Sequence, residues 1–175
     1  MTDGDGRDET AWALAARLVE IHRAIGARAM HDLPIYNPRL DTRAVGFRPH
    51  RGWVVGILVT PWFMNLVAAA RPDGPPLPPC QVGDSWALAL PAATVEMLRG
   101  DLDGFGRLDS APLFSPMGMF DDPAIAATSA QAAIETLFTP GAVDPDRPPP
   151  TSAAPTEGCG GLGRRALLFG GGGGR

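Results

Sequence analysis

The sequence contains few of the residues from which metal centres and disulfide frameworks are built. Its 175 residues include two cysteines and three histidines. Cys80 and Cys159 lie far apart and form no C-x-x-C pair, and His22, His31 and His50 show no metal-ligand spacing. Two cysteines in this arrangement make neither a zinc module nor a disulfide scaffold. The sequence therefore predicts a protein of a reducing compartment that has no metal and no cofactor.

An excess of positive charge is also missing. The chain has 15 basic and 19 acidic residues, which give a net charge of −4. This balance offers no electrostatic reason for binding nucleic acid. The N-terminus, MTDGDGRDET, is acidic and polar, the opposite of the basic start of a secretory signal. We expect a cytoplasmic protein that does not bind nucleic acid.

The longest uncharged run, WVVGILVTPWFMNLVAAA at 53–70, is too interrupted for a membrane span. Pro61 would remove a backbone hydrogen bond near its middle, and Thr60 and Asn65 would need polar partners in hydrocarbon. The β-branched residues at its start favour a buried strand. We predict that Trp53–Val59 is a core strand and that the protein is not embedded in a membrane.

No motif indicates catalysis. The acidic pairs at 101/103 and 121–122 are explained by a turn and by a helix cap, and Ser115 has no G-x-S-x-G around it. A match to G-x-G-x-x-G at 158–163 follows a proline-rich stretch, whereas a dinucleotide fingerprint follows a strand. We predict that the protein is not an enzyme.

The pattern of apolar residues predicts an α+β fold, a mostly antiparallel sheet flanked by an N-terminal and a C-terminal helix. Helical spacing runs from about Asp8 to Met30, with His22 expected at the edge of the helix. A second helix is expected to start at 121–123, with Asp121 or Asp122 as its cap, and to end at Phe138. The predicted domain is 8–140, between disordered residues 1–7 and a Pro/Gly-rich disordered tail at 141–175.

Between the helices the sequence predicts short strands and turns. A hairpin is expected from the strands Ala44–Arg48 and Trp53–Val59. The type of secondary structure stays open in three further segments. The stretch 100–109 is expected to be turn-rich because of its glycines. The three segments are Phe63–Ala70 (strand or helix), Ser85–Leu90 (weak alternation) and Thr94–Leu98 (strand or short helix).

Methionine and aromatic residues gather in two places beside irregular chain. Trp62, Phe63 and Met64 follow the Thr60-Pro61 bend, and a second cluster surrounds Pro116. Methionine adapts to apolar peptides of varied shape, so the two clusters together are candidates for a binding groove. The alternative is that both clusters belong to the core.

Four stretches, in this order and spacing, resemble the HybE/HupJ family of [NiFe]-hydrogenase assembly chaperones. They are LPIYNPRL (33–40), AVGFR (44–48), WVVGILVTPWFMNL (53–66) and LFSPMGMF (113–120), within a resemblance that covers roughly residues 10–140. The resemblance implies a cytosolic accessory factor without catalysis. Its expected partner is the precursor of the hydrogenase small subunit with its twin-arginine signal peptide, or else the large subunit.

The candidate partner-binding residues lie in these stretches: Asn37, Pro38, Arg48, Pro61, Trp62, Phe63, Met64, Asn65, Ser115, Pro116 and Met117. Of these, Trp62 to Asn65 are the first to test, as a binding edge after the core strand. An alternative function within the same pathway is a thiol-dependent protective or redox factor that uses Cys80, in a proline-rich loop.

The tail contains GRRALLF at 163–169, which looks like the core of a twin-arginine signal. Its place near the C-terminus, with no long apolar segment after it, excludes an export signal. One interpretation is a basic end on a flexible tail. The other is that Arg164 and Arg165 form a pseudo-signal that occupies the chaperone's own site until a client displaces it.

Overall fold

The computed structural model describes residues 5–75, 77 and 79–141, and for residues 5–8 the backbone alone. Two helices enclose a sheet. In chain order the elements are α1 (Asp5–Ile25), η1 (Gly26–Met30), β1 (Arg43–His50), β2 (Trp53–Val59), β3 (Met64–Ala70), β4 (Ser85–Ala89), β5 (Thr94–Leu98), β6 (Asp101–Leu102), β7 (Gly106–Phe114) and α2 (Pro123–Phe138). η1 continues α1 as a π-helical turn.

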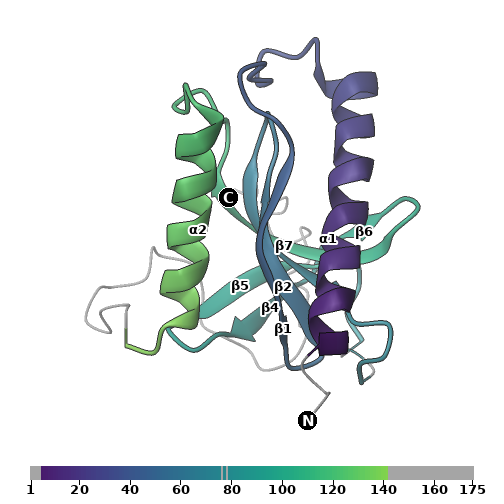
Figure 1. Ribbon diagram of the computed structural model, residues 1–175. Helices are drawn as coiled ribbons and strands as arrows, with labels where there is room; N and C mark the ends of the chain where they lie inside the picture. The colour runs from purple at the N-terminus through teal and green to yellow at the C-terminus, as the bar shows by residue number, and fades with distance from the viewer. Residues whose placement is uncertain (1–4, 76, 78, 142–175) are drawn as a thin grey trace, which may run out of the picture.

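The seven strands form one antiparallel sheet in the order β1-β2-β3-β7-β5-β4, with the short β6 paired to β7. Figure 1 shows α1 and α2 standing on either side of it. The predicted α+β class, the antiparallel sheet and the two flanking helices are therefore confirmed. The hairpin of β1 and β2 is confirmed as well, and most of the ambiguous segment 63–70 is a strand, β3 (Met64–Ala70).

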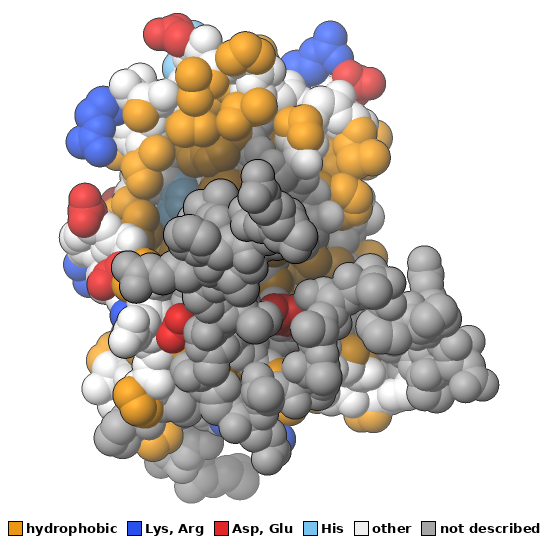
Figure 2. Space-filling view, turned by 180° about the vertical axis from the view of Figure 1, so that it is seen from behind, with side chains coloured by type: hydrophobic (Ala, Val, Ile, Leu, Met, Phe, Trp, Pro, Cys, Tyr) orange, Lys and Arg blue, Asp and Glu red, His pale blue; other side chains and the backbone are white. Residues whose placement is uncertain are grey.

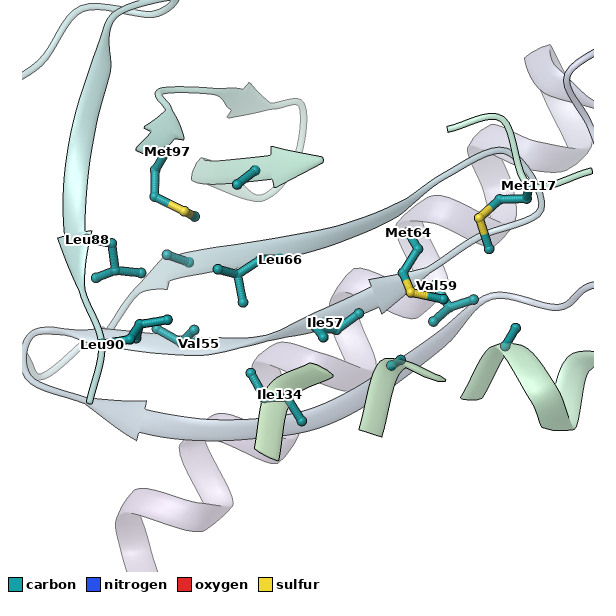
Figure 3. Close-up of a cluster of buried hydrophobic side chains, with 14 of the residues drawn as sticks. Val55, Ile57, Val59, Met64, Leu66, Leu88, Leu90, Met97, Met117 and Ile134 are labelled. Carbon is teal, nitrogen blue, oxygen red and sulfur yellow. The ribbon is translucent and has the colours of Figure 1, made fainter. Parts of the chain in front are cut away.

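β2 is buried along its whole length because each face of the sheet carries its own core. Val55, Ile57 and Val59 face α2 and pack with Ile134 and with Leu88 of β4, as Figure 3 shows. Successive side chains of a strand point to opposite faces, so Leu58 faces the other way. It packs against Leu18 of α1 and Val67 of β3. Burial on two faces explains why this strand has no polar position.

Two glycines let β1 approach its neighbours. A Cβ on Gly56 would lie 2.2 Å from the Phe47 ring, so β2 needs a residue without a side chain where Phe47 crosses it. Gly46 has a φ of 64°, in the left-handed region, and a Cβ there would lie 2.5 Å from Ile134. The β1–β2 register shifts between Val45 and Arg48, which makes Gly46 part of a β-bulge.

The Asp109 carboxylate anchors the β4–β5 hairpin to β7. It is fully buried and accepts hydrogen bonds from Trp86 Nε1 at 2.8 Å and from Arg107 Nη2 at 2.7 Å. Arg99 of the β5–β6 connection lies 3.9 Å away. Trp86 in turn stacks on Trp53, with ring centroids 4.8 Å apart. One buried carboxylate thus joins β4, β5 and β7.

The sequence prediction was wrong for the stretch 100–109. It is not mainly a turn: Asp101–Leu102 and Gly106–Phe114 are strands, and only residues 103–105 connect them. Gly104 and Gly106 have positive φ values of 75° and 98°, and they form the tight turn of this hairpin. The first helix also begins at Asp5, earlier than the predicted start at Asp8. None of the helices in the described residues has the length and apolar character to cross a membrane.

Candidate functional site

Asn37 joins three segments that are distant in sequence, and we call this meeting point the Asn37 junction. Its backbone N–H donates to the carbonyl of Pro61 at 2.8 Å. Its side-chain Nδ2 donates to the carbonyls of Met117 and Phe120, at 3.1 and 2.8 Å. The segment 31–42, the β2–β3 turn and the loop 115–122 are therefore held together at one end of the sheet.

The turn between β2 and β3 is built by Thr60 and Pro61. The backbone N–H of Thr60 donates to the Phe63 carbonyl at 2.8 Å, which closes the β2–β3 hairpin, and Pro61 has a fixed φ inside the connection. Thr60 Oγ1 also accepts the N–H of Phe63 at 2.9 Å. The bend predicted at Thr60-Pro61 is thus a rigid turn that presents its Pro61 carbonyl to Asn37.

An aromatic cluster fills the space between this turn and α1. Trp62 stacks on Tyr36, with ring centroids 6.1 Å apart, and lies against His22 at 6.4 Å. His22 is buried, not at the helix edge as expected, and Phe63 contacts it edge-on at 5.8 Å. Its Nδ1 lies 2.9 Å from the Leu18 carbonyl, which can only accept, so Nδ1 carries the proton. Burial lowers the pKa of His22.

Stability is expected to fall as the pH drops below about 6.5, because the unfolded chain takes up a proton that native His22 resists. The loss continues until the pH reaches the lowered native pKa of His22. The pKa of Asp41 is also lowered, by its bond to Arg23. The stability that this bond contributes is lost only when the pH falls below 3.8, so it does not affect the range in which His22 acts. Urea denaturation at stepped pH would measure the effect. The His22→Gln variant should lack this slope between neutral pH and the native pKa, and an identical slope in both proteins would contradict the assignment.

The structure brings most of the candidate residues together at the Asn37 junction but buries several of them. Trp62, Met64 and Met117 are buried, as the core alternative predicted, and a partner cannot contact them in this arrangement. Phe63 and Asn65 are partly buried, and the Ser115–Pro116 peptide bond is cis. Pro38, Pro61, Ser115 and Pro116 belong to the segments that meet there. Arg48 lies elsewhere, on β1.

Exposed apolar side chains surround the junction instead. Leu33 and Ile35 precede Asn37, Phe114 ends β7, and Met119, 68% exposed, lies between the two carbonyls that Asn37 holds. We call these four residues the junction patch. In Figure 2 hydrophobic side chains gather at the upper end of the molecule, where the connecting segments of Figure 1 meet. Sequence reasoning missed Leu33, Ile35 and Phe114, although they lie in or beside the quoted stretches.

The other candidates gain no support as a site. Cys80 lies in the loop between β3 and β4 and is disulfide-bonded, so it is not the free thiol that the redox alternative requires. The disulfide also disagrees with the reducing compartment that the cysteine count predicted. The pseudo-signal residues Arg164 and Arg165 fall outside the residues that the structure describes. Within the described residues, His, Cys, Asp and Glu side chains form no group of three that could hold a metal ion.

Comparison with known proteins gives consistent matches. The family described as "[NiFe]-hydrogenase assembly, chaperone, HybE" matches residues 13–170. The match extends beyond residue 140, where the sequence resemblance was expected to end. The chain is 41% identical to the hydrogenase expression/formation protein HupJ of Bradyrhizobium diazoefficiens over 133 residues, which are 76% of this chain and 75% of that protein.

A second sequence relative and a solved structure support the same family. The chain is 35% identical to the probable rubredoxin HupJ of Rhodobacter capsulatus over 128 residues, 72% of this chain but only 45% of that protein. The solution structure of HybE from Escherichia coli superposes with a TM-score of 0.56 and 26% identity, covering 92% of this chain and 91% of that one. The match over residues 13–170 shows that the chain belongs to the HybE family of [NiFe]-hydrogenase assembly chaperones.

Proposed function

We propose that this protein binds the precursor of the [NiFe]-hydrogenase small subunit through its twin-arginine signal peptide, in the cytoplasm and before export. The observation that carries the proposal is the junction patch, four exposed apolar side chains around the Asn37 junction. Family membership supplies the pathway, since the family is one of hydrogenase assembly chaperones. The protein would act by binding and not by catalysis.

The patch has the chemistry that a signal peptide requires. The central region of such a peptide is apolar and varies in sequence. Met119 is flexible and polarizable, and Leu33, Ile35 and Phe114 add apolar surface around it. The net charge of −4 favours the approach of the basic region that precedes the apolar one. Exposed apolar side chains that gather on one surface are a feature of protein interaction sites.

The junction gives the patch a fixed shape. Asn37 holds both carbonyls that flank Met119, and Arg39 forms an ion pair with Asp121 on the same two segments. The Phe114 ring lies edge-on against Phe120, with centroids 5.3 Å apart. A surface that is ordered before binding loses less entropy when it binds. We infer that the buried candidate residues serve the site by building this support.

Placing a charge in the patch should abolish capture of the precursor. We expect the double variant Ile35→Glu/Met119→Glu to lose most of the small-subunit precursor from a pull-down out of cells blocked in hydrogenase export. Each carboxylate would have to be desolvated against the apolar peptide, at a cost of about 2 kcal/mol or more. The identity of the captured subunit also decides between the small-subunit and the large-subunit precursor.

The matched control is Val82→Glu. Val82 is 64% exposed but lies in the loop before β4, away from the Asn37 junction. It should capture the precursor like the unaltered protein. Equal capture by the patch variant and by the control would contradict the proposed site, and capture of mature enzyme alone would contradict the proposed function.

A further inference from the structure

β1 is an open edge of the sheet. It pairs with β2 on one side and begins the strand order, so no strand of the described residues lies along its other side. Arg51 has a φ of 54° in the two-residue turn that closes the hairpin at the His50–Trp53 pair. Hydrogen-bonded pairs alternate along β2 from Trp53, so Leu58 does not bond β1. Its partner Ala44, which lies beyond the bulge at Gly46, therefore points its backbone N–H and C=O away from β2. Within the part of the chain that the structure describes, no residue forms a hydrogen bond with them.

A hollow of about 600 Å³ lies along this edge. Ala44, Gly46, Phe47 and Arg48 of β1 line it together with residues of α1, and we call it the β1 groove. The groove is near the N-terminal end of α1, whereas the Asn37 junction follows the C-terminal end of that helix (Figure 1). The two α1 residues that line it are Trp12 and Ala15, and Trp12 is 75% exposed.

Only the first half of the edge can pair with another strand. Pro49 has no backbone N–H to donate. Arg48 Nε donates to the carbonyl of Gly46 at 3.0 Å, and its guanidinium lies over the Phe138 ring of α2, 4.8 Å from the centroid. These features protect the far half of β1 against edge-to-edge aggregation. The open half lies beside Trp12, an exposed aromatic side chain without an evident structural role.

We propose that the β1 groove binds an extended, uncharged segment of another polypeptide, which pairs with the edge at Ala44 and packs against Trp12. This is strand addition, in which the main chain supplies affinity and neighbouring side chains supply selectivity. A second copy fits poorly, because α1 and α2 stand on both sides of β1 and would meet the partner's own helices (Figure 1). Among the described residues that line the groove, Arg48 alone is charged, and its positive charge disfavours a basic segment.

The inference concerns a surface separate from the junction patch and does not depend on the proposed function. The test uses the full chain and a decapeptide of alternating leucine and threonine with blocked ends. Its matched control is the same peptide N-methylated at alternate residues, which cannot pair with a strand edge. Titration followed by fluorescence anisotropy gives the affinity, and the shifts of the Ala44 amide and the Trp12 indole N–H in NMR spectra locate the site.

We expect the plain peptide to bind and the N-methylated peptide not to bind. Trp12→Ala should weaken binding roughly tenfold, as is common for an aromatic anchor. Ala44→Pro should abolish it, because proline removes the outward N–H without breaking the β1–β2 ladder. Ile125→Ala, on the exposed face of α2, should change nothing.

Three results would overturn the inference. One is equal binding of the two peptides, and another is the absence of binding at the solubility limit of the plain peptide. The third is a dimer of the unaltered chain that dissociates in the Ala44→Pro variant, which would make a second copy the occupant. Thermal unfolding of the Trp12→Ala variant should match that of the unaltered protein, since the side chain is 75% exposed.

Discussion

Replacing Asp109 with alanine is expected to lower the free energy of unfolding by about 3–5 kcal/mol, the range found when one member of a buried ion pair is removed. The Asp109 side chain is fully buried, and those of Arg99 and Arg107 are only 13% and 14% exposed. Without the carboxylate, Trp86 Nε1 loses its acceptor and the buried charge of Arg99 loses its counter-charge. Urea denaturation at pH 7 would measure the change.

Two controls make this result specific. Asp103→Ala removes an exposed carboxylate from the β6–β7 turn and should change stability by no more than about 0.5 kcal/mol. Asp109→Asn retains an oxygen that can accept from Trp86 but loses the charge, so its stability should fall between the other two. If Asp109→Ala were as stable as Asp103→Ala, the buried ion pairs would contribute nothing to the fold.

The size of this effect follows from the topology of the sheet. β5 pairs with β7 through Leu98 and Ser110 alone, so the backbone ladder holds the β4–β5 hairpin weakly in the described sheet. Leu88 and Met97 of that hairpin are nevertheless part of the core that faces α2 (Figure 3). The Asp109 bonds and the stack of Trp86 on Trp53 fix where these apolar residues lie. Loss of Asp109 should therefore weaken the packing of the β4–β5 hairpin against the core that faces α2.

The elements that could be predicted from the sequence are those whose local signals agree with their tertiary surroundings. Trp53–Val59 is uncharged and rich in β-branched residues, and it is buried on both faces. The hairpin with β1 follows from the same pattern. The stretch 100–109 was mistaken for turns because Gly104 and Gly106 are turn residues, although the strand that they introduce continues to Phe114. A glycine marks the turn but not the pairing that follows it.

For the candidate site, local sequence patterns could not predict which side chains are exposed. Trp62 and Met64 have the composition of a binding surface, but Tyr36 and His22 cover Trp62 from segments that are distant in sequence. Which side chain remains exposed depends on the Asn37 hydrogen bonds, and no periodicity in the sequence reveals those bonds. The quoted stretches nevertheless converge on one end of the molecule, so the predicted location was closer to the observed site than the predicted contacts were.

Replacing Asn37 with alanine is expected to reduce both stability and client capture. The carbonyls of Met117 and Phe120 would lose their donor, at a cost of about 1–3 kcal/mol for each group left unsatisfied. Urea denaturation gives the stability, and a pull-down of the hydrogenase precursor, at a temperature where the variant is fully folded, gives the capture. A decrease in capture under these conditions reports the lost shape of the junction patch and not a lost fold.

Asn37→Asp separates the roles of the two side-chain atoms. Aspartate retains the oxygen that accepts the Arg39 N–H at 3.1 Å, but it has no N–H to donate and places a carboxylate against two carbonyls. It should therefore be at least as destabilising as alanine. If the aspartate variant matched the unaltered protein in stability and capture, the donors of Asn37 would not organise the site. If it were as impaired as alanine, the bonds to residues 117 and 120 would be what positions Met119 for the client.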